Sequence, residues 1–183
     1  YTGNGMIDPN LTRANYISSV YAEYGFTDRL TGIIYFPYFS RAVVNEQVSG
    51  TTGEVISEGD AINSVGDTDI QLKYGLFQNG SVKVSVSLTL GLPTGNSSGG
   101  RDGSLQTGDG EFNQLVTIDA SRSFPIGKVN TYATLSAGFN NRTKGFSDEF
   151  RFLVEGGVLI GKWIAILRIN GVNSLKNGDD NFT

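Results

Sequence analysis

The segment 82–92, VKVSVSLTLGL, alternates apolar and polar residues almost without exception. Valine or leucine occupies every even position, and lysine, serine, threonine or glycine occupies the odd positions between them. Successive side chains of a β-strand point to opposite faces, so this segment predicts a strand with one apolar and one polar face. In a soluble sandwich or barrel the apolar face would line a core. In a membrane β-barrel it would contact lipid, and the polar face would line the lumen.

Composition narrows the chemistry that the chain can perform. The 183 residues include neither cysteine nor histidine, which excludes disulfides, thiolate or histidine metal ligands and Ser-His-Asp catalysis. A net charge of −4 argues against general nucleic-acid binding, which uses a basic patch. The 25 glycines, 11 phenylalanines and 8 tyrosines, without any helix-period run, are typical of an all-β protein. We therefore expect one all-β domain over residues 1–183 that is not an enzyme and uses no cofactor.

Seven further segments read as strands, which gives an antiparallel up-and-down arrangement of eight. Each is about twice as long as the ~5–6 residues of a typical soluble strand, and long enough to cross a membrane at a tilt, which takes ~9–11 residues. The eight expected strands cover residues 13–25, 30–45, 65–77, 82–92, 111–124, 129–142, 149–160 and 162–173.

The connections between these strands alternate in length. Four are short and carry hairpin-turn residues: FTDR, QNGS, PIGK and Gly161-Lys162, with Asn79-Gly80 as the strongest signal. Three are longer and polar: SGTTGEVISEGDAINS, PTGNSSGGRDGSLQTGDG and TKGFSDE. Short turns at one edge and long loops at the other are typical of outer-membrane barrels. This sorting favours a transmembrane barrel with its valine face toward lipid, and a soluble lipocalin-like barrel is the alternative.

Charged residues lie in the middle of the predicted polar faces. In a membrane barrel they would line the lumen and set the selectivity of a pore. In a closed barrel they would neutralise one another inside a packed polar interior, and both interpretations remain open. The candidate lumen-lining residues are Asp67, Asp69, Lys73, Glu111, Asp119, Arg151, Glu155 and Arg168.

Two other features invite a binding interpretation. The segment 33–44, IIYFPYFSRAVV, is apolar or aromatic on both faces, so Tyr35 and Phe39 are candidates for an apolar ligand patch or for packing against a plug or partner. GDTD (66–69), GDGE (108–111) and NGDD (177–180) place carboxylates near strand ends, as a calcium site would. None matches the EF-hand loop pattern, so we interpret them as solvated loop acids and expect no metal site.

The order of turns and loops also indicates whether the sequence contains all the strands of a barrel. It places the start of the first strand and the end of the eighth on the long-loop side. Bacterial barrels of this class have an even number of strands and normally keep both chain ends in the periplasm. We therefore expect a fragment that lacks at least one strand at each end of a ten- to twelve-stranded barrel. The alternative is an eight-stranded barrel with unusual topology.

Four segments resemble, in order, recurrent segments of the outer-membrane barrel family assigned to the phenol meta-cleavage pathway. They are YAEYGFTDRLTGIIYFPY (21–38), VGDTDIQLKYGLF (65–77), LTLGLPTG (88–95) and TGDGEFNQLVTIDASRSF (107–124). The family is loosely similar to toluene and fatty-acid channel barrels. The resemblance implies a porin-like barrel of about twelve strands in a Gram-negative outer membrane. It implies a channel or transporter for small hydrophobic molecules, with no catalytic residues.

The alternative function is a non-catalytic structural or accessory subunit of a larger outer-membrane complex. The expected partners are outer-membrane lipid, other outer-membrane proteins and a small hydrophobic ligand, with no nucleic acid. A channel and an accessory subunit differ in whether the barrel interior is open to water.

Overall fold

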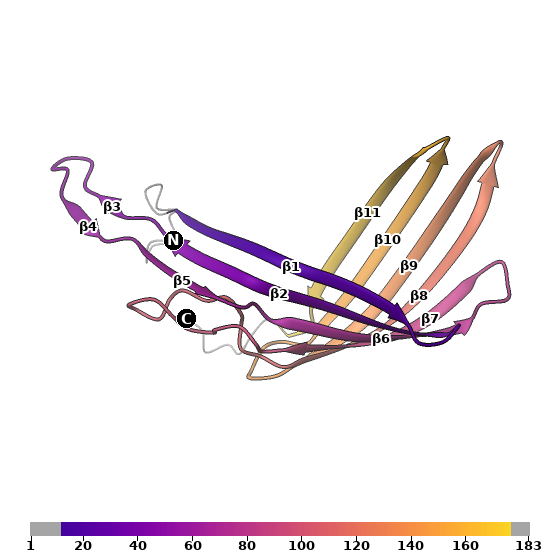
Figure 1. Ribbon diagram of the computed structural model, residues 1–183, viewed down its shortest axis with the longest axis horizontal. Coiled ribbons are helices and arrows are strands. Elements are labelled where there is room, and N and C mark those ends of the chain that lie inside the picture. Colours follow the sequence, from indigo (N-terminus) through magenta and orange to yellow (C-terminus); the bar gives the residue numbers. More distant parts are fainter. Residues whose placement is uncertain (1–11, 177–183) are drawn as a thin grey trace. The chain divides into compact units, whose positions relative to one another are not determined.

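The computed structural model describes residues 12–176, and every regular element in this range is a β-strand (Figure 1). No helix in this range is long and apolar enough to cross a membrane. The strands are β1 (Arg13–Gly25), β2 (Leu30–Val44), β3 (Gln47–Val48), β4 (Val55–Ser57), β5 (Asp60–Ser64), β6 (Thr68–Phe77), β7 (Lys83–Leu92), β8 (Asn113–Ile126), β9 (Val129–Arg142), β10 (Glu149–Ile160) and β11 (Trp163–Ser174).

Eight strands form one antiparallel sheet in the order β1-β2-β6-β7-β8-β9-β10-β11. Each of them pairs with the next long strand along the chain, so the predicted all-β, antiparallel arrangement of eight strands is confirmed. Within the described residues the sheet order runs from β1 to β11.

The chain divides into two compact units. We call residues 12–21, 35–68 and 93–110 the loop unit, and residues 22–34, 69–92 and 111–176 the sheet unit. The boundaries fall within β1, β2 and β6, at the end of β7 and in the connection before β8. The sheet unit contains all four short connections, and the loop unit contains most of two long ones.

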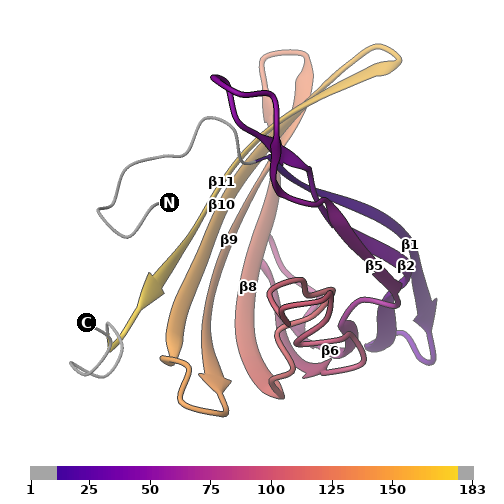
Figure 2. The same cartoon turned by 90° about the vertical axis from the view of Figure 1, so that its left-hand side faces the viewer.

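The sheet unit is built from long hairpins in continuous register. β8 and β9 pair from Asn113↔Arg142 to Ile126↔Val129, and β10 and β11 pair from Glu149↔Ser174 to Ile160↔Trp163. Figure 2 shows β8 to β11 side by side as a curved layer. Antiparallel order places the four short connections at one end of the sheet, which we call the short-turn end.

Two of the short connections are two-residue turns that begin with glycine. Gly127 has φ +60° and Gly161 has φ +61°, and a lysine follows each of them. A left-handed glycine at the first central position is typical of a type II′ turn, whose twist matches that of the flanking strands. The predicted hairpins at these positions are confirmed.

The connection at Asn79-Gly80 differs from its prediction. β6 ends at Phe77 and β7 begins at Lys83, and neither Asn79 nor Gly80 has a positive φ. A five-residue connection does not need the mirror-image dihedral angles of a two-residue turn. The predicted hairpin is present, and its connection is one residue longer than the predicted QNGS.

The loop unit contains structure that the sequence did not predict. β5 pairs antiparallel with the end of β2, from Ser40↔Ser64 to Val44↔Asp60. β3 and β4 form a separate two-stranded sheet. The long connection after β2, expected as a polar loop, therefore includes these short strands. Their few residues carry no clear alternation, because their pairing partners rather than their own sequence hold them extended.

Candidate functional site

The register of the sheet unit assembles a polar face from five neighbouring strands. Residues that pair across strands share a face, so each register row collects side chains from β7 to β11. One row joins Lys83, Ser121, Thr134, Glu155 and Arg168. The next joins Ser85, Asp119, Ser136, Leu153 and Asn170.

The rows that alternate with these polar rows carry apolar side chains on the opposite face. One row joins Val84, Ala120, Leu135, Val154 and Ile169, and its neighbour joins Val86, Ile118, Ala137, Phe152 and Gly171. The pattern seen in the sequence of one strand is therefore continuous across five. We call these two surfaces the polar face and the apolar face.

Exposure on the two faces is the reverse of that in a soluble domain. Leu135 is 58% exposed, and most other large apolar side chains of its face are similarly open. Among the described residues the buried apolar side chains are Ala42, Leu105 and Pro37, all in the loop unit. In the sheet unit the buried residues with polar side chains are Ser87, Glu111, Thr131 and Asn140. Ordinary globular domains bury apolar side chains and expose charged ones.

A hydrogen-bonded triad lies in the middle of the polar face. The Tyr132 hydroxyl donates to Glu155 Oε1 at 2.8 Å, and Arg168 Nε donates to Glu155 Oε2 at 2.6 Å. The Tyr132 ring lies over Gly157, where an added Cβ would come within 1.9 Å of the ring. Glycine at this position lets the ring lie flat against the sheet and aim its hydroxyl at Glu155.

A second cluster, which we call the rim cluster, lies at the end of the sheet unit opposite the short turns. Arg142 Nε pairs with Glu111, and Arg142 Nη1 lies 2.9 Å from Glu149 Oε1. Arg151 Nη2 lies 2.7 Å from Glu149 Oε2, and Asn140 Nδ2 donates to the same oxygen at 3.2 Å. Two carboxylates and two guanidiniums balance in charge, and Glu111 is only 2% exposed.

Two elements hold Arg142 in the rim cluster from different sides. Arg142 ends β9, and its guanidinium lies 4.5 Å from the ring centroid of Phe146 in the following connection. Its backbone N–H donates to Asp148 Oδ1 at 2.9 Å. A cation stacked on an aromatic ring and paired with two carboxylates is fixed in position.

The structure places seven of the eight predicted lumen residues on or beside the polar face of the sheet unit. Glu155 and Arg168 meet in the triad, and Arg151 and Glu111 meet in the rim cluster through Arg142 and Glu149. Asp119 accepts a long hydrogen bond from Ser85 at 3.5 Å. Lys73 is half-buried on β6.

The remaining predicted acid, Asp67, lies in the loop unit, whereas Asp69 lies in the sheet unit on the same face of β6 as Lys73. β6 begins at Thr68, so Asp67 precedes the strand to which the sequence assigned it. Its carboxylate accepts hydrogen bonds from the backbone N–H groups of Gly95 at 2.9 Å and Asp109 at 2.8 Å, and so anchors the 93–110 loop. Asp69 is half-buried near the start of β6. Glu111 likewise precedes its strand, because β8 begins at Asn113.

The candidate ligand patch lies in the loop unit. Tyr35 is half-buried and Phe39 is exposed, and they lie on the same face of β2 with buried Pro37 between them. The Pro37 carbonyl accepts a hydrogen bond from Gly66 N–H at 2.8 Å. Proline therefore lacks only the hydrogen bond that a backbone N–H would donate at this position.

Sequence reasoning missed an ion cluster in the loop unit. Arg101 pairs with Glu58, its backbone N–H donates to Asp60 Oδ2 at 2.6 Å, and its Nη2 donates to the Gly59 carbonyl at 2.7 Å. The pKa of the neighbouring Asp102 is lowered because the Ser104 backbone N–H donates to its carboxylate. The opposite charges of the SEGD and GRDG segments were the available signal, but 41 residues separate Asp60 from Arg101.

The acidic segments do not form a metal site in the part of the chain that the structure describes. Among residues 12–176 no group of three or more histidine, cysteine, aspartate or glutamate side chains could hold a metal ion. NGDD (177–180) lies outside the described residues.

No family model, curated protein or solved structure matches the chain. The resemblance to the outer-membrane barrel family therefore stays a prediction, and function has to be argued from the two faces of the sheet.

Proposed function

We propose that the protein is a bacterial outer-membrane β-barrel that lets small solutes pass along a polar interior. The observation that carries this proposal is the reversed exposure of the sheet unit, with large apolar side chains open on one face and polar side chains crowded on the other. A contiguous exposed apolar surface spanning several long strands is unfavourable in water and stable in lipid.

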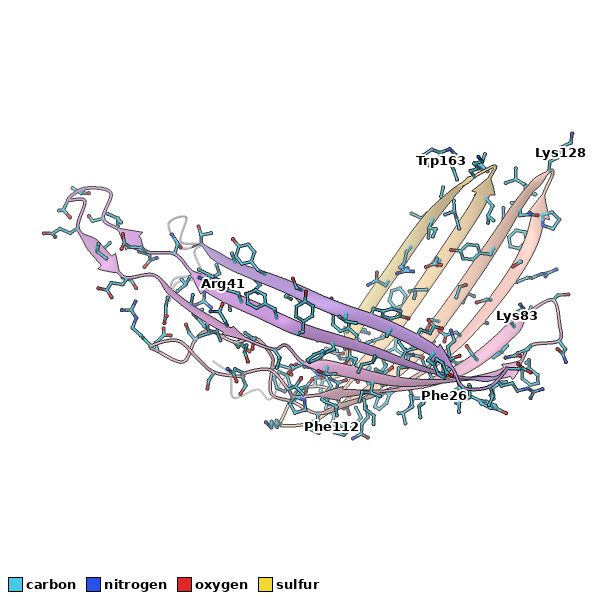
Figure 3. All side chains as sticks on the ribbon, viewed as in Figure 1. Phe26, Arg41, Lys83, Phe112, Lys128 and Trp163 are labelled. Atoms are coloured by element: carbon cyan, nitrogen blue, oxygen red, sulfur yellow. The ribbon has the colours of Figure 1, made fainter. Side chains whose placement is uncertain are left out.

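Strand length and the ends of the hairpins fit the same interpretation. β8 and β9 have 14 residues each and β10 and β11 have 12, enough for a tilted strand to cross the ~30 Å hydrocarbon layer. Trp163 is 82% exposed at the tip of the β10–β11 hairpin (Figure 3). Tryptophan is enriched where a membrane protein meets the lipid headgroups.

The first and last strands of the sheet order, β1 and β11, also need partners in a membrane. Lipid offers no hydrogen-bond partners, so a membrane sheet must close and leave no unpaired edge. Our proposal therefore includes a closed barrel in which β1 and β11 also pair with neighbouring strands.

The side chains of the polar face indicate which kind of solute would pass through the barrel. The face combines serine, threonine and asparagine with charged groups, which favours water and small polar or charged solutes. The hydrophobic substrate implied by the family resemblance would depend on Tyr35 and Phe39 in the loop unit.

The second candidate is a non-catalytic accessory subunit with a closed interior. The observation that favours it is that Glu155, Arg168 and the four charges of the rim cluster are all paired. Paired charges can fill a polar interior without conducting ions. In this case the apolar face would contact a partner barrel as well as lipid.

Conductance separates the two candidates. We expect full-length protein, purified from outer membranes in mild detergent, to give discrete current steps in a planar bilayer. Arg168→Glu adds negative charge to the polar face and should raise the cation-to-anion permeability ratio, measured as the reversal potential in a KCl gradient. Lys128→Glu, at the tip of the β8–β9 hairpin, is the matched control and should leave the ratio unchanged.

Absence of current from correctly assembled wild-type protein would reject the channel. If the same preparation then ran as a complex with stoichiometric partners in native mass measurements, the accessory subunit would be favoured.

A further inference from the structure

A pocket at the short-turn end of the sheet unit is lined with several cationic side chains. Its volume is about 510 Å³. Residues from the β1–β2 turn, β6, β7 and β8 contribute to it, including Asp28, Arg29, Lys73, Lys83, Ser85 and Ser121. Lys83 and Ser121 are register partners, so this part of the lining belongs to the polar face.

The charges of this pocket are not balanced. Arg29, Lys73 and Lys83 bring three positive charges, and Asp28 brings one negative charge, which leaves +2. Within residues 12–176 none of these three cations forms an ion pair, whereas Arg142, Arg151 and Arg168 on the same unit all do. Collecting like charges around one cavity is unfavourable unless an anion joins them.

Hydrogen bonds hold the β1–β2 turn of the pocket in place. Thr27 Oγ1 accepts from the backbone N–H groups of Arg29 at 3.2 Å and Leu30 at 3.0 Å. The Arg29 carbonyl accepts from Gly75 N–H at 2.8 Å, and the Asp28 carbonyl accepts from Gln78 Nε2 at 3.0 Å. These bonds tie the turn to β6 and to the next connection, so the site is built before a ligand arrives.

We propose that this pocket binds a phosphate group carried by a small molecule. Guanidinium and ammonium groups are the side chains that proteins use to bind phosphate oxygens. The volume exceeds that of a bare phosphate ion and falls within the ~300–1,000 Å³ range of small-molecule sites. The inference does not rest on the proposed channel, since binding requires no conduction.

Binding of inorganic pyrophosphate tests the proposal. Full-length protein in phosphate-free, nonionic detergent micelles is titrated calorimetrically at low salt, where charge interactions are least screened. We expect the double variant Lys73→Gln/Lys83→Gln to bind at least tenfold more weakly than wild type. The control double variant Lys128→Gln/Lys162→Gln removes the same charge at two hairpin tips and should bind like wild type. Circular dichroism and heat-modifiable gel mobility verify that both variants fold.

The remaining outcomes are also decisive. An equal loss in both double variants would show a nonspecific response to net charge and overturn the pocket. In another outcome, pyrophosphate does not bind, but short-chain phosphatidic acid in the micelles binds to wild type and at least tenfold more weakly to Lys73→Gln/Lys83→Gln. This result would support the pocket and assign the phosphate to a lipid headgroup. If neither compound binds to wild type, the proposal is wrong.

Discussion

Replacing Leu135 with arginine is expected to stop the protein from assembling in the outer membrane. Leu135 is the midpoint of β9, and its register row is apolar on all five strands from β7 to β11. An arginine on the lipid face at the centre of the bilayer costs about 2–4 kcal/mol. We expect little or no heat-modifiable, protease-resistant barrel in purified outer membranes, with the variant chain degraded or aggregated.

Ser136→Arg is the matched control, one residue further along the same strand. Ser136 lies on the polar face and pairs in register with Asp119, so the new cation gains a carboxylate neighbour. This variant should assemble at the wild-type level. If Leu135→Arg assembled normally and Ser136→Arg did not, the two faces would be assigned the wrong way round.

Replacing Arg142 with methionine is expected to produce the largest loss of stability in the sheet unit. The Glu111 side chain is buried, and removal of Arg142 leaves its charge, and part of that of Glu149, uncompensated at the rim. Breaking a buried ion pair on one side costs about 3–5 kcal/mol. Urea unfolding of the protein in detergent micelles should show a lower midpoint with an unchanged slope.

Two further variants show whether the burial of the Glu111 charge causes the loss of stability. Arg101→Met breaks the exposed pair with Glu58 in the loop unit and should not move the midpoint measurably. Adding Glu111→Gln to Arg142→Met removes the buried charge and should restore part of the lost stability. A midpoint for Arg142→Met equal to that of wild type would contradict the structural role of the rim cluster.

The long strands of the fold were predictable because their signal is local. Alternation within β7, β8 and β10 identifies both faces without reference to neighbouring strands, and Gly127 and Gly161 mark the turns. Most predicted boundaries agree with the structure to within a few residues. Continuity of the faces across strands is a consequence of register, which the hairpin turns set.

What the sequence did not show depends on distant partners. The extended segment DAINS is a strand because it pairs with the end of β2, and Asp67 anchors a loop through backbone groups of Gly95 and Asp109. Glu111 was identified as a lumen charge, but its partner Arg142 was not, because 31 residues separate them. The cationic pocket was missed because its three cations come from three separate segments.

Contact between the apolar face of the sheet unit and lipid can be tested directly along β9. The chain has no cysteine, so single cysteines can be introduced at successive positions 133–139 of β9 and spin-labelled in reconstituted vesicles. We expect labels at odd positions to be accessible to oxygen, which partitions into lipid. Labels at even positions should be accessible to a water-soluble nickel complex. Accessibility with the opposite phase, or nickel accessibility at every position, would contradict lipid contact by the apolar face.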